Sequence, residues 1–227
     1  MINIVFENEH FVVCDKPGGV LSTPSRFQDE DGRMCLGTAL QEKLKIQIFP
    51  VHRLDFEVSG LVMYAKNAEA HRHANAWFEK KQIQKTYRAL TMRQDYSHIP
   101  DDIVNSKVKI DIEPGLHCKW ESLVLRGKRR AYVSPIGKPS LTLAIYLGEN
   151  KNNQLLWDLH PVTGRPHQLR FDLSRHGFPI LGDKLYGSNI NFSASAIALQ
   201  SYEIDFKNAP GVSSLDLPEK IQISPLE

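Results

Sequence analysis

The sequence contains few cysteines, in no arrangement that suggests a covalent or metal-bound framework. Its 227 residues include Cys14, Cys35 and Cys118, an odd number, far apart and without a C-x-x-C pair. This pattern argues against a disulfide scaffold and against a cysteine zinc site. The chain also lacks an apolar run long enough to cross a bilayer, and its first residues lack the features of a signal peptide. We therefore expect a cytoplasmic protein.

The motifs of several common enzyme classes are absent. The chain contains no G-x-G-x-x-G fingerprint, no Walker phosphate loop and no recognisable Ser-His-Asp arrangement, and it has no repeat, low-complexity tract or linker. An apolar content of 41% and a charged content of 24% are those of an ordinary globular protein. The length suits one large domain, or two small ones that share a core.

The basic residues are segregated, although the net charge is only +2. Residues 66–93 contain seven Lys or Arg against two acids, whereas acids outnumber bases from Glu203 onward. Residues 117–138 contain one acid, Glu121, and six basic residues: Lys119, Arg126, Lys128, Arg129, Arg130 and Lys138. Segregated basic segments in a nearly neutral chain indicate a surface for nucleic acid. A merely solvated face is the alternative.

Element patterns favour an α+β fold. Residues 5–13 are typical of a hairpin, 15–19 (DKPGG) of a sharp turn, and 36–44 of a helix; another helix should follow an N-cap at Asn67. Strands are predicted at 61–65, 86–90, 107–110, 141–147 and 155–159. Strands outnumber helices and do not alternate with them regularly, so a doubly wound sheet fits less well.

Two stretches carry candidate chemistry. At 52–55 (HRLD) a single carboxylate, Asp55, lies between a basic pair and an apolar run, and an ionised, partly desolvated aspartate is a competent nucleophile or base. An exposed Arg–Asp pair closing a turn is the alternative.

A helix starting at 163–165 (TGR) and ending before Gly177 would offer backbone N–H groups and Arg165 to a phosphate. The alternative is that Arg165 and Arg170 pair with surface acids.

Together these segments resemble the RluA-type pseudouridine synthases over nearly the whole chain. Residues 52–55 with 59–61 (SGL) are similar to the motif around that family's catalytic aspartate, here Asp55. Residues 85–89 (KTYRA) resemble the second motif, with Tyr87 as the active-site tyrosine, although a strand tyrosine that merely packs would look the same. Residues 163–170 (TGRPHQLR) resemble the third motif, in which Arg170 pairs with the aspartate. The turn at 15–19 and the segments 177–183 and 186–187 also match.

The resemblance implies isomerisation of uridine to pseudouridine in ribosomal or transfer RNA. Asp55 would act at the sugar–base junction, Arg170 would keep it charged and oriented, and Tyr87 would stack on uracil. The base must leave the RNA stack, and Arg53 is the candidate to fill the vacated space. The residues implied in substrate binding are His52, Arg53, Arg165, His167, Gln168 and Leu169. No metal or cofactor is required.

The implied architecture is one catalytic domain over residues 1–227, without the small RNA-binding module that many relatives carry ahead of it. The implied fold is a mixed, mainly antiparallel central sheet with flanking helices, and we expect a monomer. The chain departs from the family pattern at Val58, at Asp172 and at 199–201 (LQS). These departures leave the catalytic residues untouched but bear on RNA contacts.

Two other readings stay open. The first is a catalytically silent protein that binds or folds RNA on the same scaffold. The second is a metal-dependent hydrolase that uses Asp55, His52, His160 and His167, although the two later histidines look hydrogen-bonded rather than metal-bound. The sequence alone does not identify the RNA or the uridine.

Overall fold

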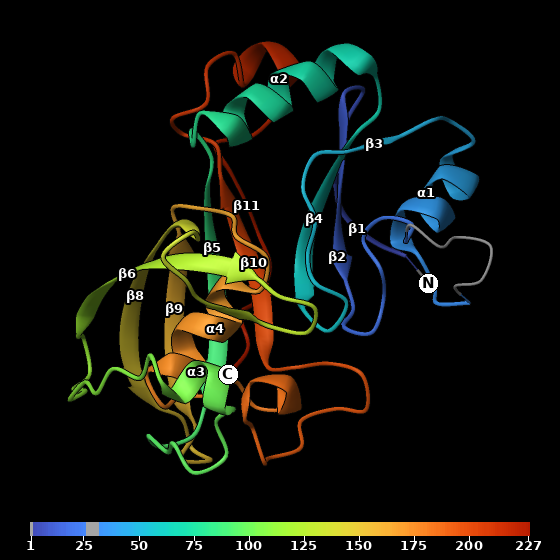
Figure 1. Ribbon diagram of the computed structural model, residues 1–227. Coiled ribbons are helices and arrows are strands. Elements are labelled where there is room, and N and C mark those ends of the chain that lie inside the picture. Colours follow the sequence, from blue (N-terminus) through green and yellow to red (C-terminus); the bar gives the residue numbers. More distant parts are fainter. Residues whose placement is uncertain (1, 26–31) are drawn as a thin grey trace. The chain divides into compact units, whose positions relative to one another are not determined.

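The computed structural model describes residues 2–25 and 32–227 and divides the chain into two compact units (Figure 1). Unit 1 comprises Met1–Lys85 and Ser201–Ser224, and unit 2 comprises Thr86–Gln200 and Pro225–Glu227. The chain passes between the units within two strands, β5 (Gln84–Thr91) and β10 (Leu199–Asp205), and once more between Ser224 and Pro225. The sheets are mainly antiparallel and carry helices, which confirms the predicted α+β fold.

The strands of unit 1 follow the order β1-β2-β4-β10. β1 (Asn3–Glu7) pairs antiparallel with β2 (Phe11–Lys16), and β2 pairs antiparallel with β4 (Ser59–Ala65). Two short strands extend this sheet: β3 (Phe49–Pro50) pairs with β4, and β11 (Lys220–Gln222) pairs with β10. The predicted hairpin is confirmed. The Asn8 side chain closes its turn by accepting from the backbone N–H groups of the residues at 10 and 11.

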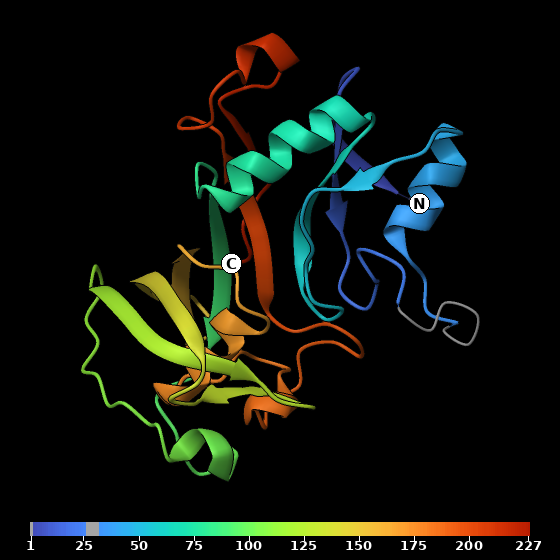
Figure 2. The same cartoon turned by 45° about the horizontal axis from the view of Figure 1, so that its top comes forward.

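The helices of unit 1 lie close to their predicted positions. α1 covers Leu36–Leu44, α2 covers Ala68–Glu79, and a short 3-10 helix, η2, covers Ser213–Leu215. Asn67 Oδ1 accepts from the Ala70 N–H at 2.9 Å, which confirms the predicted cap. α2 packs across β3 and β4 (Figure 2). Its buried residues join a core with the strands: Phe11, Val13, Leu61, Met63, Ala70, Ala74, Trp77, Ile204 and Phe206.

The strands of unit 2 follow the order β5-β9-β8-β6-β7, and the pairs β5–β9, β9–β8, β8–β6 and β6–β7 are antiparallel. Their bounds are β6 His117–Arg126, β7 Ala131–Val133, β8 Lys138–Glu149 and β9 Leu155–Pro161. The strand predicted at 107–110 is wrong. That segment is irregular because its backbone bonds elsewhere: Val108 N–H donates to the Arg175 carbonyl, and the Val108 carbonyl accepts from Tyr96 Oη.

Helix α4 (Gln168–Arg175) packs on β8 and β9, and the shorter α3 (Asp101–Val104) and η1 (Lys184–Tyr186) lie against it. The predicted helix start at 163–165 is wrong, because α4 begins at Gln168 after His167, whose φ is 57°. Residues 163–167 form a loop instead. Every residue of α4 from Gln168 to Ser174 is buried, so its polar face is enclosed as well as its apolar face.

Candidate active site

Asp55 lies in the loop between β3 and β4, and the residue before it is fixed to Ser22. Leu54 N–H donates to Ser22 Oγ at 3.0 Å, and Ser22 Oγ donates to the Leu54 carbonyl at 3.1 Å. Tyr64 of β4 donates from its hydroxyl to the Ser22 carbonyl at 2.6 Å. Ser22 and Tyr64 are buried, so these bonds are shielded from competition with water. The chain therefore enters Asp55 along a fixed path.

The residue after Asp55 is held by the N-terminal turn. The Phe56 carbonyl accepts from Gly19 N–H at 2.8 Å and from Lys16 Nζ at 3.3 Å. Lys16 is fully buried, and its ammonium also donates to the Val20 carbonyl at 2.7 Å. Burial lowers the pKa of Lys16 to about 8, while the carboxylate of Asp55 favours its charged form. The predicted turn at 15–19 thus holds the loop that carries Asp55 at the residue after the aspartate.

Gly60, at the start of β4, is required by close contact with β10. Its φ is +106°, and a Cβ at this position would lie 2.2 Å from the Ser201 carbonyl oxygen and 2.6 Å from its nitrogen. No side chain fits there without moving the strand. The glycine of the 59–61 motif therefore has a structural reason within unit 1.

His52 is held in a structural position that reduces its capacity to bind a substrate. Its Nε2 accepts from the Met63 N–H at 3.2 Å, and its ring stacks on Phe78 with centroids 5.1 Å apart. Burial lowers the pKa of His52 to about 3, so the ring is neutral at physiological pH. Among the described residues, His52 Nδ1 has no hydrogen-bond partner. Arg53, next to it, is exposed, as a residue that enters an RNA stack must be.

Tyr87 and α4 lie on the same face of the sheet in unit 2. Tyr87 is 6% exposed and pairs with Leu159 of β9, which in turn pairs with Ala144 of β8. Directly paired residues share a face, and so do residues two apart on one strand. Thr142, two residues before Ala144, bonds to α4. The Tyr87 side chain therefore faces the side on which α4 packs.

Arg170 of α4 forms a bidentate ion pair with Asp183. Its Nε donates to Oδ2 at 2.7 Å and its Nη2 to Oδ1 at 2.8 Å, and the two side chains are 2% and 1% exposed. The guanidinium carbon also lies 5.2 Å from the centre of the Tyr186 ring. A planar fork bound along one edge has a fixed orientation. Asp183 is a partner that the sequence analysis missed, although it lies in the segment 177–183 that matched the family.

His167 joins the same cluster through Tyr186. The Tyr186 hydroxyl accepts from the Ala131 N–H at 2.7 Å and lies 3.1 Å from His167 Nδ1. Burial raises the pKa of Tyr186, so its hydroxyl stays protonated. On its other side, His167 Nε2 is 3.5 Å from Nη2 of Arg126. The predicted substrate residue His167 thus connects the buried Arg170 cluster to the basic end of β6.

The other residues predicted to bind substrate, in α4 and the loop before it, differ in solvent exposure. Gln168 and Leu169 are 4% and 7% exposed, whereas Arg165 in the loop is partly exposed. Arg165 Nε donates to the Pro139 carbonyl at 2.8 Å. Of these three, Arg165 is therefore the side chain within reach of a ligand.

The departures from the family pattern have structural roles. Val58 is a core residue at 3% exposure. Gln200 Oε1 accepts from the Leu226 N–H at 2.9 Å and so holds the C-terminal segment. Ser201 supplies the backbone that Gly60 approaches. Asp172 lies on the buried face of α4, where burial raises its pKa to about 7 in spite of a hydrogen bond from Thr142.

Asp172→Asn should change the pH dependence of stability. Because the folded pKa is above the unfolded value of about 4, protonation of Asp172 stabilises the fold below that value, and this contribution is lost as pH rises to about 7. The titratable groups that the described residues place beside it are Arg175 and His176. Facing residues of β6 and β8 include Trp120 and Thr142, which do not titrate near neutrality.

Urea unfolding of wild type and Asp172→Asn at pH 5, 6.5 and 8 measures this effect. From pH 5 to 8 the wild type should lose stability relative to the variant, by on the order of 2 kcal/mol. The comparison cancels the titration of His176, whose pKa is lowered to about 4 chiefly by burial. A constant difference across the range would show that Asp172 does not titrate there.

The histidines of the hydrolase reading have hydrogen-bond partners. His160 Nδ1 lies 3.3 Å from Thr86 Oγ1, and Nδ1 of His167 lies beside the Tyr186 hydroxyl. Within residues 2–25 and 32–227, no group of three or more His, Cys, Asp or Glu side chains is arranged to hold a metal ion.

No helix in this part of the chain has the length and apolar character of a membrane span.

Comparison with known proteins identifies the family. A sequence profile of the RNA pseudouridylate synthases matches residues 10–175. The dual-specificity RNA pseudouridine synthase RluA of Pasteurella multocida is 36% identical over 186 residues, which is 82% of this chain and 77% of that protein. The enzyme of the same name from Vibrio vulnificus is 32% identical over 89% of this chain and 76% of its own length.

A solved structure agrees on the fold. Human RNA pseudouridylate synthase domain containing 1 superposes on 100% of this chain and 84% of its own, with a TM-score of 0.68 at 21% identity. With the profile match and the two relatives, the assignment no longer depends on the motifs alone. The chain belongs to the RluA-type RNA pseudouridine synthases, isomerases that convert uridine in RNA to pseudouridine.

Proposed function

We propose that this chain acts through Asp55 as the catalytic carboxylate, with Tyr87 and Arg170 completing the active site. The observation that carries the proposal is the double clamp on the Asp55 loop, by Ser22 before the aspartate and by Lys16 and Gly19 after it. A catalytic group must be held in one geometry to act on a flipped base. Pseudouridine formation on transcribed RNA, by wild type and by Asp55→Asn, tests it.

The proposed reaction exchanges one bond of the uracil for another. The bond between N1 and the ribose C1′ breaks, the base rotates and C5 bonds to C1′. C5 then loses its proton and N1 gains one, either that same proton or one from solvent. Asp55 stabilises or captures the electron-deficient C1′, and Tyr87 packs against the base while the proton leaves. Atoms and charge balance without a redox partner.

Arg170 is proposed to orient Asp55 through the edge of the guanidinium that does not face Asp183. Asp183 binds Nε and Nη2, so a second carboxylate would approach the edge formed by the two terminal nitrogens. A guanidinium supports two such contacts, whereas an ammonium has no fixed plane. Asp183 would then serve as the fixed support from which Arg170 acts.

The proposed substrates are structured ribosomal and transfer RNAs. The two relatives described above are named as dual-specificity enzymes, which supports more than one RNA target for this chain. We further propose that the protein works in the cytoplasm as a monomer and that residues 1–227 act as one catalytic domain. A panel of transcribed tRNAs and rRNA fragments, mapped for pseudouridine, would identify the targets.

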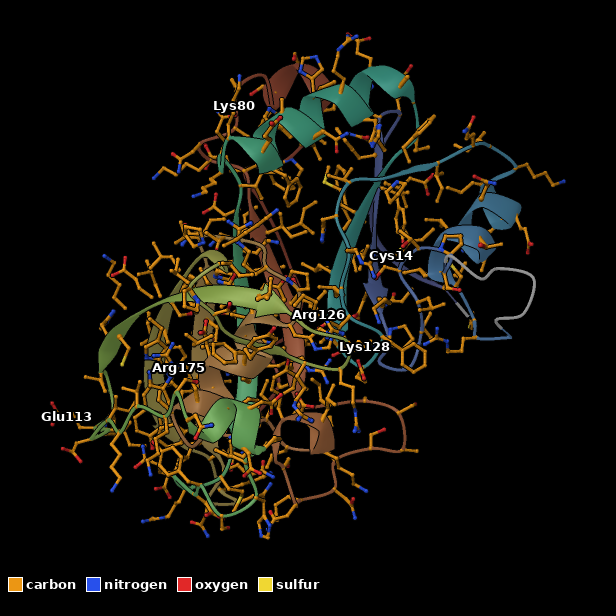
Figure 3. All side chains as sticks on the ribbon, in the orientation of Figure 1. Cys14, Lys80, Glu113, Arg126, Lys128 and Arg175 are labelled. Atoms are coloured by element: carbon orange, nitrogen blue, oxygen red, sulfur yellow. The ribbon has the colours of Figure 1, made fainter. Side chains whose placement is uncertain are left out.

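The RNA-binding surface is proposed to include the exposed end of the β6–β7 hairpin. Arg126 and Lys128 lie close together there (Figure 3), and Lys128 and Arg129 are exposed. Arg130 differs, because Asp102 of α3 accepts from its Nη2 at 2.8 Å and from its Nε at 3.2 Å. An arginine whose guanidinium is already bound to a carboxylate along one edge is less available to bind a phosphate. The phosphate contacts are therefore assigned to Lys128 and Arg129.

Neutralising Lys128 and Arg129 to glutamine should flatten the salt dependence of RNA binding. The slope of log K against log salt is negative, and its magnitude should decrease by about 0.7 for each phosphate that the protein no longer neutralises. Titration of a fluorescent tRNA transcript at several salt concentrations measures it. Neutralising Lys207 and Lys220, in the acid-rich end of the chain, gives the matched control and should leave the slope unchanged. Equal slopes for the two double variants would contradict the assignment of phosphate contacts to Lys128 and Arg129.

The same assays separate the proposal from its alternative. A catalytically silent RNA-binding protein would bind the transcripts with a comparable salt slope but form no pseudouridine in the wild type. Turnover by the wild type, lost in Asp55→Asn, is incompatible with that reading. Both proteins would be assayed on the same transcripts.

A further inference from the structure

The buried Gln168 side chain is the centre of a hydrogen-bond network. Its Oε1 accepts from Thr163 Oγ1 at 2.8 Å and from the Arg165 N–H at 2.9 Å. Its Nε2 donates to the Leu141 carbonyl at 3.0 Å and to Thr142 Oγ1 at 2.9 Å. Both donors and both acceptor positions of the amide are used. The amide therefore has one orientation, and it is committed to protein contacts.

The network continues from Gln168 into the interior beneath α4. Thr142 is fully buried, and its hydroxyl, which accepts from Gln168, donates to Asp172 Oδ2 at 2.7 Å. Asp172 is 1% exposed. Hydrogen bonds that are shielded from water and involve a carboxyl group are stronger than exposed ones, and loss of one partner leaves the other unsatisfied. The Thr142 hydroxyl thus joins the side chains of Asp172 and Gln168, which lie one turn apart on α4.

The outer end of the network is the loop 163–167. The Thr163 hydroxyl accepts from the Leu141 N–H at 2.9 Å while donating to Gln168. The Gln168 N–H donates to the Arg165 carbonyl at 3.1 Å, so Arg165 is bonded to Gln168 through both backbone groups. The path of the loop, and the starting point of the Arg165 side chain, therefore depend on Gln168.

We propose that Gln168, Thr142 and Asp172 are positioning residues that set the conformation of the RNA-contacting loop 163–167 without touching RNA. The proposal rests on the proposed function and extends it, because it assigns RNA contact to the loop that carries Arg165 and His167, two residues that the family resemblance implies in substrate binding. The predicted role of Gln168 in substrate binding becomes indirect. Its side chain shapes the loop that presents Arg165, and the buried Thr142 and Asp172 hold that side chain.

Thr142 offers an isosteric test. Thr142→Val keeps the shape and removes the hydroxyl, which breaks the contacts with Gln168 and Asp172 together. Thr142→Ser keeps the hydroxyl and removes only a methyl group, so it is the matched control. Thr142 is fully buried, so an effect of its hydroxyl on RNA recognition must be indirect, and exchange at the Arg165 amide shows whether it passes through the loop.

Two measurements follow, on the transcript that the wild type modifies fastest among a panel of tRNAs and rRNA fragments. In Thr142→Val the KM should rise roughly three- to tenfold, the factor expected for one net hydrogen bond, while kcat stays within about twofold. Hydrogen exchange at the Arg165 amide should accelerate by a similar factor. Thr142→Ser should match the wild type in both. A purely structural role would lower the folded fraction and the apparent kcat, with KM unchanged.

The outcomes distinguish this inference from the proposed function. A wild type that modifies no transcript would refute the proposed function, and hydrogen exchange would still report whether Thr142 controls the loop. An active wild type with equal KM and equal exchange in the valine and serine variants would overturn the inference alone. If Thr142→Val does not fold, Thr163→Val against Thr163→Ser makes the same comparison at the partly exposed end of the network, and equal exchange at Arg165 in that pair would also overturn it.

Discussion

Asp55→Asn should abolish pseudouridine formation and leave RNA affinity within about threefold of the wild type, because affinity rests on phosphate contacts spread over basic surfaces. The amide keeps the shape of the side chain. It neither attacks C1′ nor carries the charge that stabilises positive character developing there. The loop should keep its path, since the clamps at Leu54 and Phe56 use backbone groups of those residues rather than the Asp55 carboxylate. Pseudouridine mapping after single-turnover incubation measures the loss.

A matched control lies two residues away. Glu57→Gln removes the same charge from the same loop and should retain turnover within a few-fold. Removing the Asp55 carboxylate also takes away a charge that favours ionised Lys16, so the fold of the variant must be checked by circular dichroism first. A folded Asp55→Asn protein that still works at a tenth of the normal rate would mean that another group performs the chemistry.

The fold could be predicted where local pattern determines structure. The helix expected at 36–44 is α1, and the one expected after Asn67 is α2, because apolar spacing and a capping side chain are local signals. β6 and β7 were missed, since Ser122 on the more buried face of β6 and Leu123 on its exposed face break the apolar alternation of that strand. The start of α4 was misplaced because a non-local contact decides it. The Gln168 side chain ties residues 163–165 to β8 as a loop.

In the candidate site, too, local sequence patterns were predictable and contacts between distant residues were not. The motif at 52–55 marked the loop that carries Asp55, but nothing in the sequence showed that Lys16 and Ser22 hold the residues on either side of it. These contacts join residues more than thirty positions apart. Likewise the motif at 163–170 marked Arg170, while its partner Asp183 became evident only when α4 and the following turn were placed together. The motifs marked the candidate catalytic side chains, whereas the groups that hold these segments became evident only from the packing.

In Arg170→Lys, turnover should fall by more than the decrease in the folded fraction of the protein explains. A lysine cannot reproduce the bidentate contact with Asp183 but keeps the positive charge, so its stability loss should be smaller than the about 3–5 kcal/mol expected when one charge of a buried pair is left without its partner. If Arg170 also orients Asp55, turnover of the folded fraction should fall by about two orders of magnitude or more, as for a misplaced catalytic group.

Asp183→Asn separates the two roles of Arg170. The variant weakens the same buried pair from the other side but leaves the guanidinium in place, so its stability should fall while turnover per folded molecule falls much less than in Arg170→Lys. Urea unfolding gives the folded fraction of each variant, and single-turnover assays give the rate for that fraction. Equal turnover losses in the two variants would assign Arg170 to holding Asp183 alone. A larger loss in Arg170→Lys requires a second function of the guanidinium, for which a contact with Asp55 is the proposed explanation.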